Sequence, residues 1–189
     1  DSDAPVTLKI IDAESNCKAE ATGRKGELRI PQVHLWQPYP GTPYLYKAEV
    51  HYGEDCYTEE FGFRTVEVKG TQFLINGEPF YFKGFSKHED SFFCGRGLDL
   101  CLDVKDINLL HWIHANSFRT SHYPYAEEIY RLCDREGIVI IDETPAVGIG
   151  AGESCDPYKT FPIREHHEQV LRDLIVRDKN HPCIVMWSM

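Results

Sequence analysis

The sequence predicts two parts in series: part of a β-sandwich over residues 1–65, then an α/β domain over residues 66–189. Two observations predict this order. In the first part, short alternating segments are separated by turns rich in Gly and Pro, a pattern typical of sandwiches. In the second part, apolar strand segments alternate with helical segments, which predicts a parallel sheet built from βα units.

Three segments of the first part have the pattern of strands. They are Val6–Ile10, Glu27–Ile30 and Tyr44–Tyr52, and each alternates along its length as a half-buried strand does. The turn Gly23–Gly26 precedes the second segment, and the proline-rich run 38–43 precedes the third. Sixty-five residues of such strands are less than a whole sandwich, and a scaffold is the simplest function for them.

A hairpin opens the second part. Phe73–Ile75 is followed by Asn76-Gly77 and then by Glu78–Phe82. Asn-Gly supplies the positive φ angles of a type I′ turn, so we expect two antiparallel strands joined at this dipeptide.

Four strands and three helices then alternate. The expected strands are about Phe80–Ser86, the start of the motif Ser117–Tyr125, which Pro124 ends, Ile138–Ile141 and Cys183–Ser188. The expected helices are about Asp103–Ala115, Ala126–Glu136 and Arg164–Arg177. The third strand is apolar on both faces, as a parallel strand covered by helices must be. The inward helix positions are expected to be Val104, Ile107, Leu110 and Ile113, then Ile129, Tyr130 and Cys133, then His167, Val170, Leu171 and Leu174.

Repeated βα units leave two candidate architectures, an open doubly wound sheet or a (β/α)8 barrel. No crossing carries GxGxxG or a P-loop, which disfavours a nucleotide-binding open sheet. The glycine-rich run Gly148–Gly152 is far from the next helix and is expected to be a flexible surface loop. We therefore expect the first four βα units of a barrel. Such a half-barrel has open edges that something else must cover.

Composition argues against several classes of partner. The formal net charge is −10 and there is no Lys/Arg block, which argues against nucleic acid or an anionic membrane surface. No apolar run has the length of a membrane span, and no export signal is visible. Seven scattered cysteines favour free thiols in a reducing, cytoplasmic compartment. His166 and His167 are adjacent in sequence, and adjacent side chains on a helix point to different faces, so we expect no metal site there. We also expect no cofactor.

Each of the four expected strands ends in polar residues. They are Lys87–Asp90, Arg119–His122, Asp142–Thr144 and Trp187–Ser188. Ligands meet the carboxyl ends of strands in α/β folds, so acids, histidines and an arginine there favour hydrolysis or proton-transfer chemistry. Each also has a structural interpretation on its own. Arg119 could pair with a buried carboxylate, and His122 could be a structural histidine.

Four motifs resemble those of glycoside hydrolase family 2. They are Lys87-His-Glu-Asp, Asn116-Ser-Phe-Arg-Thr-Ser-His-Tyr-Pro-Tyr-Ala-Glu-Glu, Gly137-Ile-Val-Ile-Ile-Asp-Glu-Thr and Arg177-Asp-Lys-Asn-His-Pro-Cys-Ile-Val-Met-Trp-Ser. The resemblance runs from about Phe61 to Met189. Before it, Leu35-Trp-Gln-Pro and Tyr44-Leu-Tyr resemble the immunoglobulin-like domain of that family. Within the family, the first two motifs are more similar to those of β-glucuronidases than to those of β-galactosidases or β-mannosidases.

This resemblance implies a retaining β-glycosidase, whose mechanism uses two carboxyl groups about 5 to 5.5 Å apart. In the family, the acid/base glutamate follows strand four in an Asn-Glu-Pro segment, and the nucleophile lies on strand seven. We therefore expect the acid/base glutamate just after Met189 and the nucleophile farther along the polypeptide. On this expectation the chain alone is inactive. By the same resemblance, Arg119 supports the nucleophile in its ionised form, His122 hydrogen-bonds the sugar, and His88 is a second sugar contact.

The implied partners are a β-glucuronide, the remainder of the same polypeptide, and further copies in a homo-oligomer of the full-length enzyme. In the family, the residues that recognise the glucuronate carboxylate lie in the other half of the barrel, so this specificity rests on the neighbouring motifs. A short third loop, 147–165, leaves substrate size open. Two alternatives stay open as well: a β-galactosidase-type hydrolase, and a non-catalytic carbohydrate-binding or assembly module.

Overall fold

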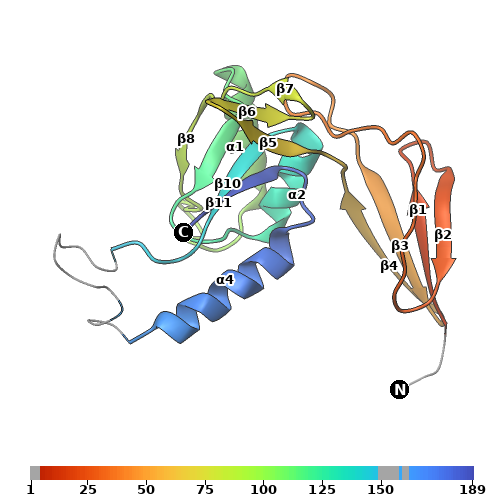
Figure 1. Cartoon of the computed structure of the whole chain (residues 1–189). Coiled ribbons are helices and arrows are strands. Elements are labelled where there is room, and N and C mark those ends of the chain that lie inside the picture. Colours follow the sequence, from red (N-terminus) through yellow and green to blue (C-terminus); the bar gives the residue numbers. More distant parts are fainter. Residues whose placement is uncertain (1–4, 149–157, 159–161) are drawn as a thin grey trace. The chain divides into compact units, whose positions relative to one another are not determined.

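The structure, a computed structural model, describes residues 5–148, 158 and 162–189, in two compact units (Figure 1). The first unit is Asp1–Phe80 with Asp134–Gly137, and the second is Tyr81–Cys133 with Ile138–Met189. Compactness thus groups residues 66–80 with the first unit. The predicted domain boundary between residues 65 and 66 was placed where the sequence pattern changes, and it stays a prediction.

The first unit contains a four-stranded antiparallel sheet in the order β2-β1-β3-β4. Its strands are β1 (Val6–Ile11), β2 (Cys17–Thr22), β3 (Tyr46–Tyr52) and β4 (Asp55–Phe61). The strands predicted at Val6–Ile10 and Tyr44–Tyr52 are confirmed, with ends shifted by one or two residues. That the sheet is part of an immunoglobulin-like sandwich stays a prediction.

The strand predicted at Glu27–Ile30 is wrong. Within the part of the chain that the structure describes, these residues belong to no sheet, and β2, which lies earlier, was missed. Leu28 and Ile30 are nonetheless less exposed than Glu27 and Arg29. Alternation therefore identified the inward side chains correctly, but a strand also needs a neighbour to accept and donate its backbone hydrogen bonds.

Aromatic side chains form the core of the first unit. The ring of buried Tyr46 lies 5.3 Å from that of Phe63 and 6.1 Å from that of Phe61. Trp36 is fully buried, and its indole N–H donates to the carbonyl oxygen of Asp134 at 2.7 Å. The N–H of a buried Trp needs such an acceptor, so this hydrogen bond satisfies the donor and also fixes the orientation of the ring.

The predicted hairpin is confirmed as part of a three-stranded sheet in the order β5-β6-β7, although its second strand includes only the first two residues of the expected Glu78–Phe82. Its strands are β5 (Val66–Lys69), β6 (Gln72–Ile75) and β7 (Glu78–Pro79). Asn76 and Gly77 have φ angles of 56° and 81°, as a type I′ turn requires. The amide of Asn76 also accepts from the Thr65 N–H at 3.0 Å and donates to the Trp36 carbonyl oxygen at 2.9 Å.

Two substitutions separate these roles of Asn76. Asn76→Gly keeps the positive φ and removes the two side-chain hydrogen bonds, so we expect the free energy of unfolding to fall by about 1 to 2 kcal/mol. Asn76→Ala also forces a Cβ into the left-handed region without a local hydrogen bond, and should lose about 1 kcal/mol more. Urea unfolding of the two variants measures both values. Equal stabilities for the two would contradict the strain contribution.

The second unit contains a four-stranded parallel sheet in the order β11-β10-β9-β8. Its strands are β8 (Gly84–Lys87), β9 (Ser117–Thr120), β10 (Val139–Glu143) and β11 (Ile184–Ser188), and its helices are α1 (Leu100–Trp112), α2 (Glu127–Glu136) and α4 (Arg164–Asp178). Spatial order follows sequence order without reversal. A nucleotide-binding doubly wound sheet reverses its strand order at the binding crevice, so this topology favours barrel units.

The predicted inward face is buried in α2, only partly buried in α4, where Leu174 is buried and His167, Val170 and Leu171 are half-buried, and wrong in α1. Ile129, Tyr130 and Cys133 of α2 are fully buried, as predicted. In α1 and at the residue after it, however, Val104 and Ile113 are 48% and 55% exposed, and Asp103 is buried with Ile107 and Leu110. The prediction was wrong there because a spacing of three drifts around the helix, whereas positions 103, 107 and 110 follow the true period of 3.6 residues.

Two further observations concern the chain as a whole. The described residues include no helix that is both long and apolar enough to cross a membrane. Six of the seven cysteines are described, and all six are free thiols. The predicted loop Gly148–Gly152 lies, apart from Gly148, outside the described residues, as does most of the segment 147–165.

Candidate functional site

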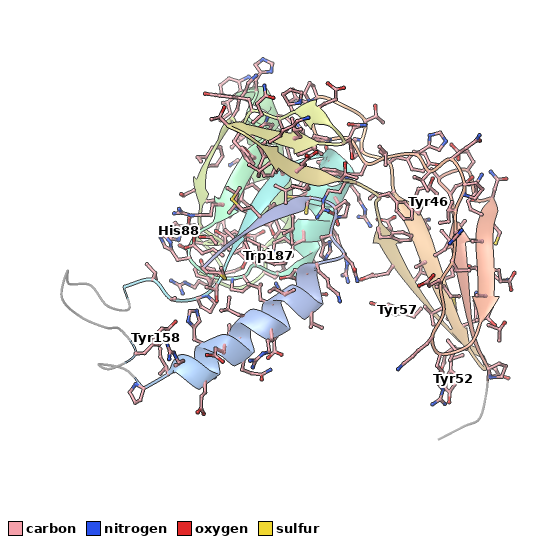
Figure 2. The ribbon with its side chains drawn as sticks, in the orientation of Figure 1. Tyr46, Tyr52, Tyr57, His88, Tyr158 and Trp187 are labelled. Atoms are coloured by element: carbon pink, nitrogen blue, oxygen red, sulfur yellow. The ribbon has the colours of Figure 1, made fainter. Side chains whose placement is uncertain are left out.

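Polar side chains gather at the carboxyl edge of the parallel sheet, where the strand ends predicted them. Lys87, Thr120, Glu143 and Ser188 are the last residues of their strands, and the register pairs Lys87 with Thr120 and Glu143 with Ser188. His88 follows directly after β8, and Trp187 lies on β11 (Figure 2). Parallel strands bring their carboxyl ends to one edge, so these residues share a rim.

Glu143 is the centre of this rim. Its Oε2 lies 3.0 Å from Nε of Arg119, and its Oε1 lies 2.9 Å from Nδ1 of His122. The hydroxyl of Ser188 donates to Oε2 at 2.9 Å. The carboxylate is only 14% exposed, so these contacts are little screened by water. One side chain thus joins the ends of β9, β10 and β11.

The position of Glu143 is itself fixed from the interior. Its backbone N–H donates to Oγ1 of Thr120 at 2.9 Å, and that hydroxyl donates to Oδ1 of Asp142 at 3.1 Å. Thr120 and Asp142 are fully buried. Buried hydrogen-bonded groups of this kind hold the functional side chains that lie outside them in one orientation.

His122 is oriented by its contact with Glu143. A carboxylate only accepts hydrogen bonds, so Nδ1 of His122 is the donor, and Nε2 is the ring nitrogen on the other side, away from Glu143. The ring of His88 lies edge-on to His122, with centroids 5.3 Å apart. His122 is 31% exposed and His88 50% exposed, so both reach the surface at this rim.

Arg119 contacts the same carboxylate. This contact fits a structural role for Arg119, as the partner of a buried carboxylate, and also a functional role at the rim. Its side chain is 39% exposed, and Nε is the atom paired with Glu143. A guanidinium has further N–H donors at its two Nη atoms, and these could serve a second anion at the rim. The structure brings Arg119, His122 and His88 to one rim, and the roles given to them by resemblance stay predictions.

Other rim residues face away from this cluster. Nζ of Lys87 is buried against α1, 2.9 Å from Oδ2 of Asp106. Glu89 accepts from the N–H of Ala126 at 3.0 Å, just before α2, and burial raises its pKa. Asp142 points into the interior. These three side chains therefore stabilise the fold, although their positions at strand ends in the sequence predicted that they would lie at the rim.

A pocket of about 350 Å³ lies beside Glu143 and Ser188. Its wall includes Thr144 and His167, whose Oγ1 and Nε2 atoms are 3.3 Å apart. Nδ1 of His167 lies 2.9 Å from the hydroxyl of Tyr158. Among the described residues, no group of three or more His, Cys, Asp or Glu side chains is placed to hold a metal ion.

Sequence reasoning named Glu143 only as one member of the third strand end and missed its central place. The signal was present in the strand pattern. Asp142 and Glu143 are adjacent, so in a strand they face opposite ways. With Asp142 buried, Glu143 had to face the rim, but the sequence does not show which of the two turns inward.

Comparisons with known proteins extend over both units. Residues 66–189 match the model of the TIM barrel domain of glycosyl hydrolases family 2, and residues 3–64 match a second model of glycosyl hydrolases family 2. Among curated proteins, the chain is 50% identical over 193 residues to a β-glucuronidase of Felis catus, covering 96% of this chain and 29% of that protein. It is 52% identical over 195 residues to a β-glucuronidase of Paenibacillus borealis, covering 97% and 32%.

A solved structure is similar as well. The β-glucuronidase of Faecalibacterium prausnitzii superposes with a TM-score of 0.92 at 59% identity, covering 98% of this chain and 31% of that one. The chain therefore spans less than a third of the length of these relatives.

Proposed function

This chain belongs to glycosyl hydrolase family 2, and we propose that it is the part of a retaining β-glucuronidase that contributes the first half of the catalytic barrel. The observation that carries the proposal is the Glu143 cluster, which orients His122 and Arg119 at the carboxyl edge of a parallel sheet. The similarity to β-glucuronidases of a mammal and of bacteria supports the substrate class. A homo-oligomer and a cytoplasmic location remain further proposals.

The edges of the sheet support a need for the remainder of the polypeptide. In the described residues, β8 and β11 each have a neighbour on one side. Beside β8, an apolar groove of about 330 Å³ is lined by Phe85, Trp112 and Ile113, which are 45%, 78% and 55% exposed. Large apolar side chains exposed together at a sheet edge indicate a surface that another element covers. The second half of a barrel would cover it.

In the proposed reaction, one carboxylate attacks the anomeric carbon while a second carboxyl group protonates the leaving oxygen. Water then hydrolyses the glycosyl-enzyme, with the second group acting as base. Both groups are proposed to lie outside this chain. Within it, Nε2 of His122 would accept a hydrogen bond from a sugar hydroxyl, and Arg119 would favour the ionised nucleophile. The chemistry requires no metal or cofactor.

The direct test is hydrolysis of a chromogenic aryl β-glucuronide by the longer polypeptide that contains this chain, compared with the matching β-galactoside. A preference for the glucuronide supports the proposal. A preference for the galactoside would indicate the sister activity. Binding of either sugar without turnover would indicate a non-catalytic carbohydrate-binding module.

Removal of the His122 ring should impair this activity. We expect His122→Ala in the longer polypeptide to lower kcat/KM for the glucuronide by a factor on the order of 10 to 1000, because a hydrogen bond that strengthens in the transition state is lost. His51→Ala is the matched control, since His51 is a partly exposed histidine on β3, outside the rim. An unchanged rate for His122→Ala would remove this residue from the site.

A further inference from the structure

Asp142 has an unusual set of contacts for a buried acid. The side chain is fully buried, and its Oδ1 accepts from the Tyr130 hydroxyl at 2.8 Å and from the Thr120 hydroxyl at 3.1 Å. The other oxygen, Oδ2, is equally buried but accepts from no donor. A buried carboxylate oxygen without a donor is costly, so this atom requires an explanation.

The neighbour of Asp142 is a second buried acid, Asp178, at the end of α4. Asp178 is fully buried, and both of its oxygens accept from Arg177, Oδ1 from Nε at 2.5 Å and Oδ2 from Nη2 at 2.8 Å. A bidentate guanidinium matches an ionised carboxylate. The side chains of Asp142 and Asp178 lie within hydrogen-bonding reach of each other. Two adjacent buried carboxylates do not both ionise readily, so one of them holds a proton.

We propose that Asp142 is the protonated member of this pair, donating from Oδ2 to Asp178, and that this neutral acid positions Glu143 through Thr120. The assignment follows from the contacts. Arg177 donates to both oxygens of Asp178. Asp142 instead accepts from two hydroxyl groups at Oδ1 and has no donor at Oδ2. A proton on Oδ2 supplies the missing hydrogen bond and leaves one positive and one negative charge in the cluster.

The groups around Asp142 agree with this charge count. Helix α2 contributes Tyr130, whose pKa burial raises, and the ring of His181 lies 5.6 Å from the Tyr130 ring. Helix α4 contributes Arg177 and Asp178. Although burial lowers the pKa of Arg177, its bonded carboxylate outweighs this and raises it. On the sheet, β9 contributes the uncharged Thr120, and the register partner on β11 is the uncharged Trp187.

Burial raises the pKa of Asp142 to about 7, and the adjacent charge of Asp178 acts in the same direction. The sign of the effect on stability follows from proton linkage. Between the ordinary value of 3.8 and the raised value, the folded chain binds a proton that the unfolded chain has released. The contribution of this group to stability is therefore fully present below the lower pKa and is lost as the pH rises through the upper one.

The path from Asp142 to the rim is short. The Thr120 hydroxyl that donates to Asp142 accepts the N–H of Glu143, and Glu143 holds His122 and Arg119. Ionisation of Asp142 would place a negative charge against Asp178 and push the two side chains apart, which would shift Thr120 and then Glu143. Asp142 is thus a positioning residue. This second step rests on the proposed function, whereas the protonation of Asp142 does not.

Asp142→Asn tests the protonation, because an amide copies a neutral carboxylic acid, with Oδ1 accepting and Nδ2 donating to Asp178. We expect the melting temperature of the wild type, in the longest folded polypeptide that contains this chain, to fall between about pH 4 and pH 8. Asp142→Asn should remove that part of the decline and melt above the wild type at about pH 8. In the wild type, infrared difference spectra should show a carboxylic-acid carbonyl band that titrates near neutrality and is missing in Asp142→Asn.

An ionised Asp142 would give the opposite results. Asp142→Asn would melt below the wild type at about pH 8, and no acid band would titrate near neutrality. Asp178→Asn is the matched control. It weakens the partner of Arg177 and should destabilise the fold, because the guanidinium, which is 36% exposed, loses its ionised bidentate acceptor. Equal effects of the two Asn variants would overturn the assignment of the proton to Asp142.

Positioning is tested by rescue. We expect Asp142→Ala to lower kcat/KM about tenfold or more, as for a small displacement of functional groups, and Asp142→Asn to recover most of that loss. In the wild type, kcat/KM should change with pH near neutrality as Asp142 ionises, and this change should be missing in Asp142→Asn. Equal activities of the Ala and Asn variants would overturn the positioning role. A wild type without glycosidase activity would instead contradict the proposed function, while the infrared and melting results would still decide the protonation.

Discussion

Glu143→Ala in the longer polypeptide is expected to lower kcat/KM for an aryl β-glucuronide by a factor on the order of 100 to 1000, because misplacing two functional side chains by about 1 Å has effects of this size. The substitution removes the carboxylate that accepts from His122 and forms an ion pair with Arg119, and it leaves the guanidinium without that carboxylate. It also frees Nδ1 of His122, so the tautomer with an acceptor at Nε2 is no longer fixed.

Steady-state kinetics with a melting curve for each variant measures this effect. Glu143→Gln keeps an acceptor for Ser188 but removes the charge, so we expect an intermediate loss. Glu127→Ala is the matched control. Glu127 is 41% exposed on α2 and pairs with Arg131 one turn later, an ion pair of small value. Full activity of Glu143→Ala would contradict the central place of this carboxylate.

Gly84→Ala is expected to destabilise the protein by about 3 kcal/mol or more, at or beyond the upper end of overpacking effects. Gly84 opens β8 and pairs with Ser117 of β9. A Cβ at this position would overlap the Ser117 carbonyl oxygen and lie 2.5 Å from its Oγ and 2.7 Å from its carbonyl carbon. Most of these atoms are backbone, so the clash would be relieved only by separating the two strands.

Urea unfolding of Gly84→Ala measures the loss, with Gly26→Ala as the matched control. Gly26 is exposed, and a Cβ there would meet no atom within 4 Å. The control should therefore match the wild type within about 0.5 kcal/mol. Equal stabilities for the two variants would mean that β8 and β9 tolerate more separation than their pairing implies.

Local chemistry made part of the fold predictable. Asn76-Gly77 marked a turn because few residue pairs adopt two successive positive φ angles, and the turn is present. The apolar run of the third strand predicted a strand covered on both faces, and Val139 and Ile140 are fully buried. Such features depend on a few neighbouring residues, so the sequence alone carries them.

Features that depend on distant partners could not be predicted in this way. Glu27–Ile30 has a strand pattern but no neighbouring strand in the described chain, and α1 buries Asp103 because Lys87 lies near it, with Nζ 3.8 Å from Oδ1. At the site, the sequence placed His122 and Arg119 at a strand end. It did not show that Glu143 joins them, because that contact depends on the register of β9 and β10.

The central claim is that this chain supplies the sugar-binding wall of a glucuronidase whose two catalytic acids lie elsewhere. The most direct measurement is the initial rate of aryl β-glucuronide hydrolysis by the 189-residue chain alone, with its folded state verified by circular dichroism. We predict a rate equal to the uncatalysed background. Turnover that rises with the concentration of the chain and disappears in His122→Ala would contradict the account, since the catalytic acids would then lie within it.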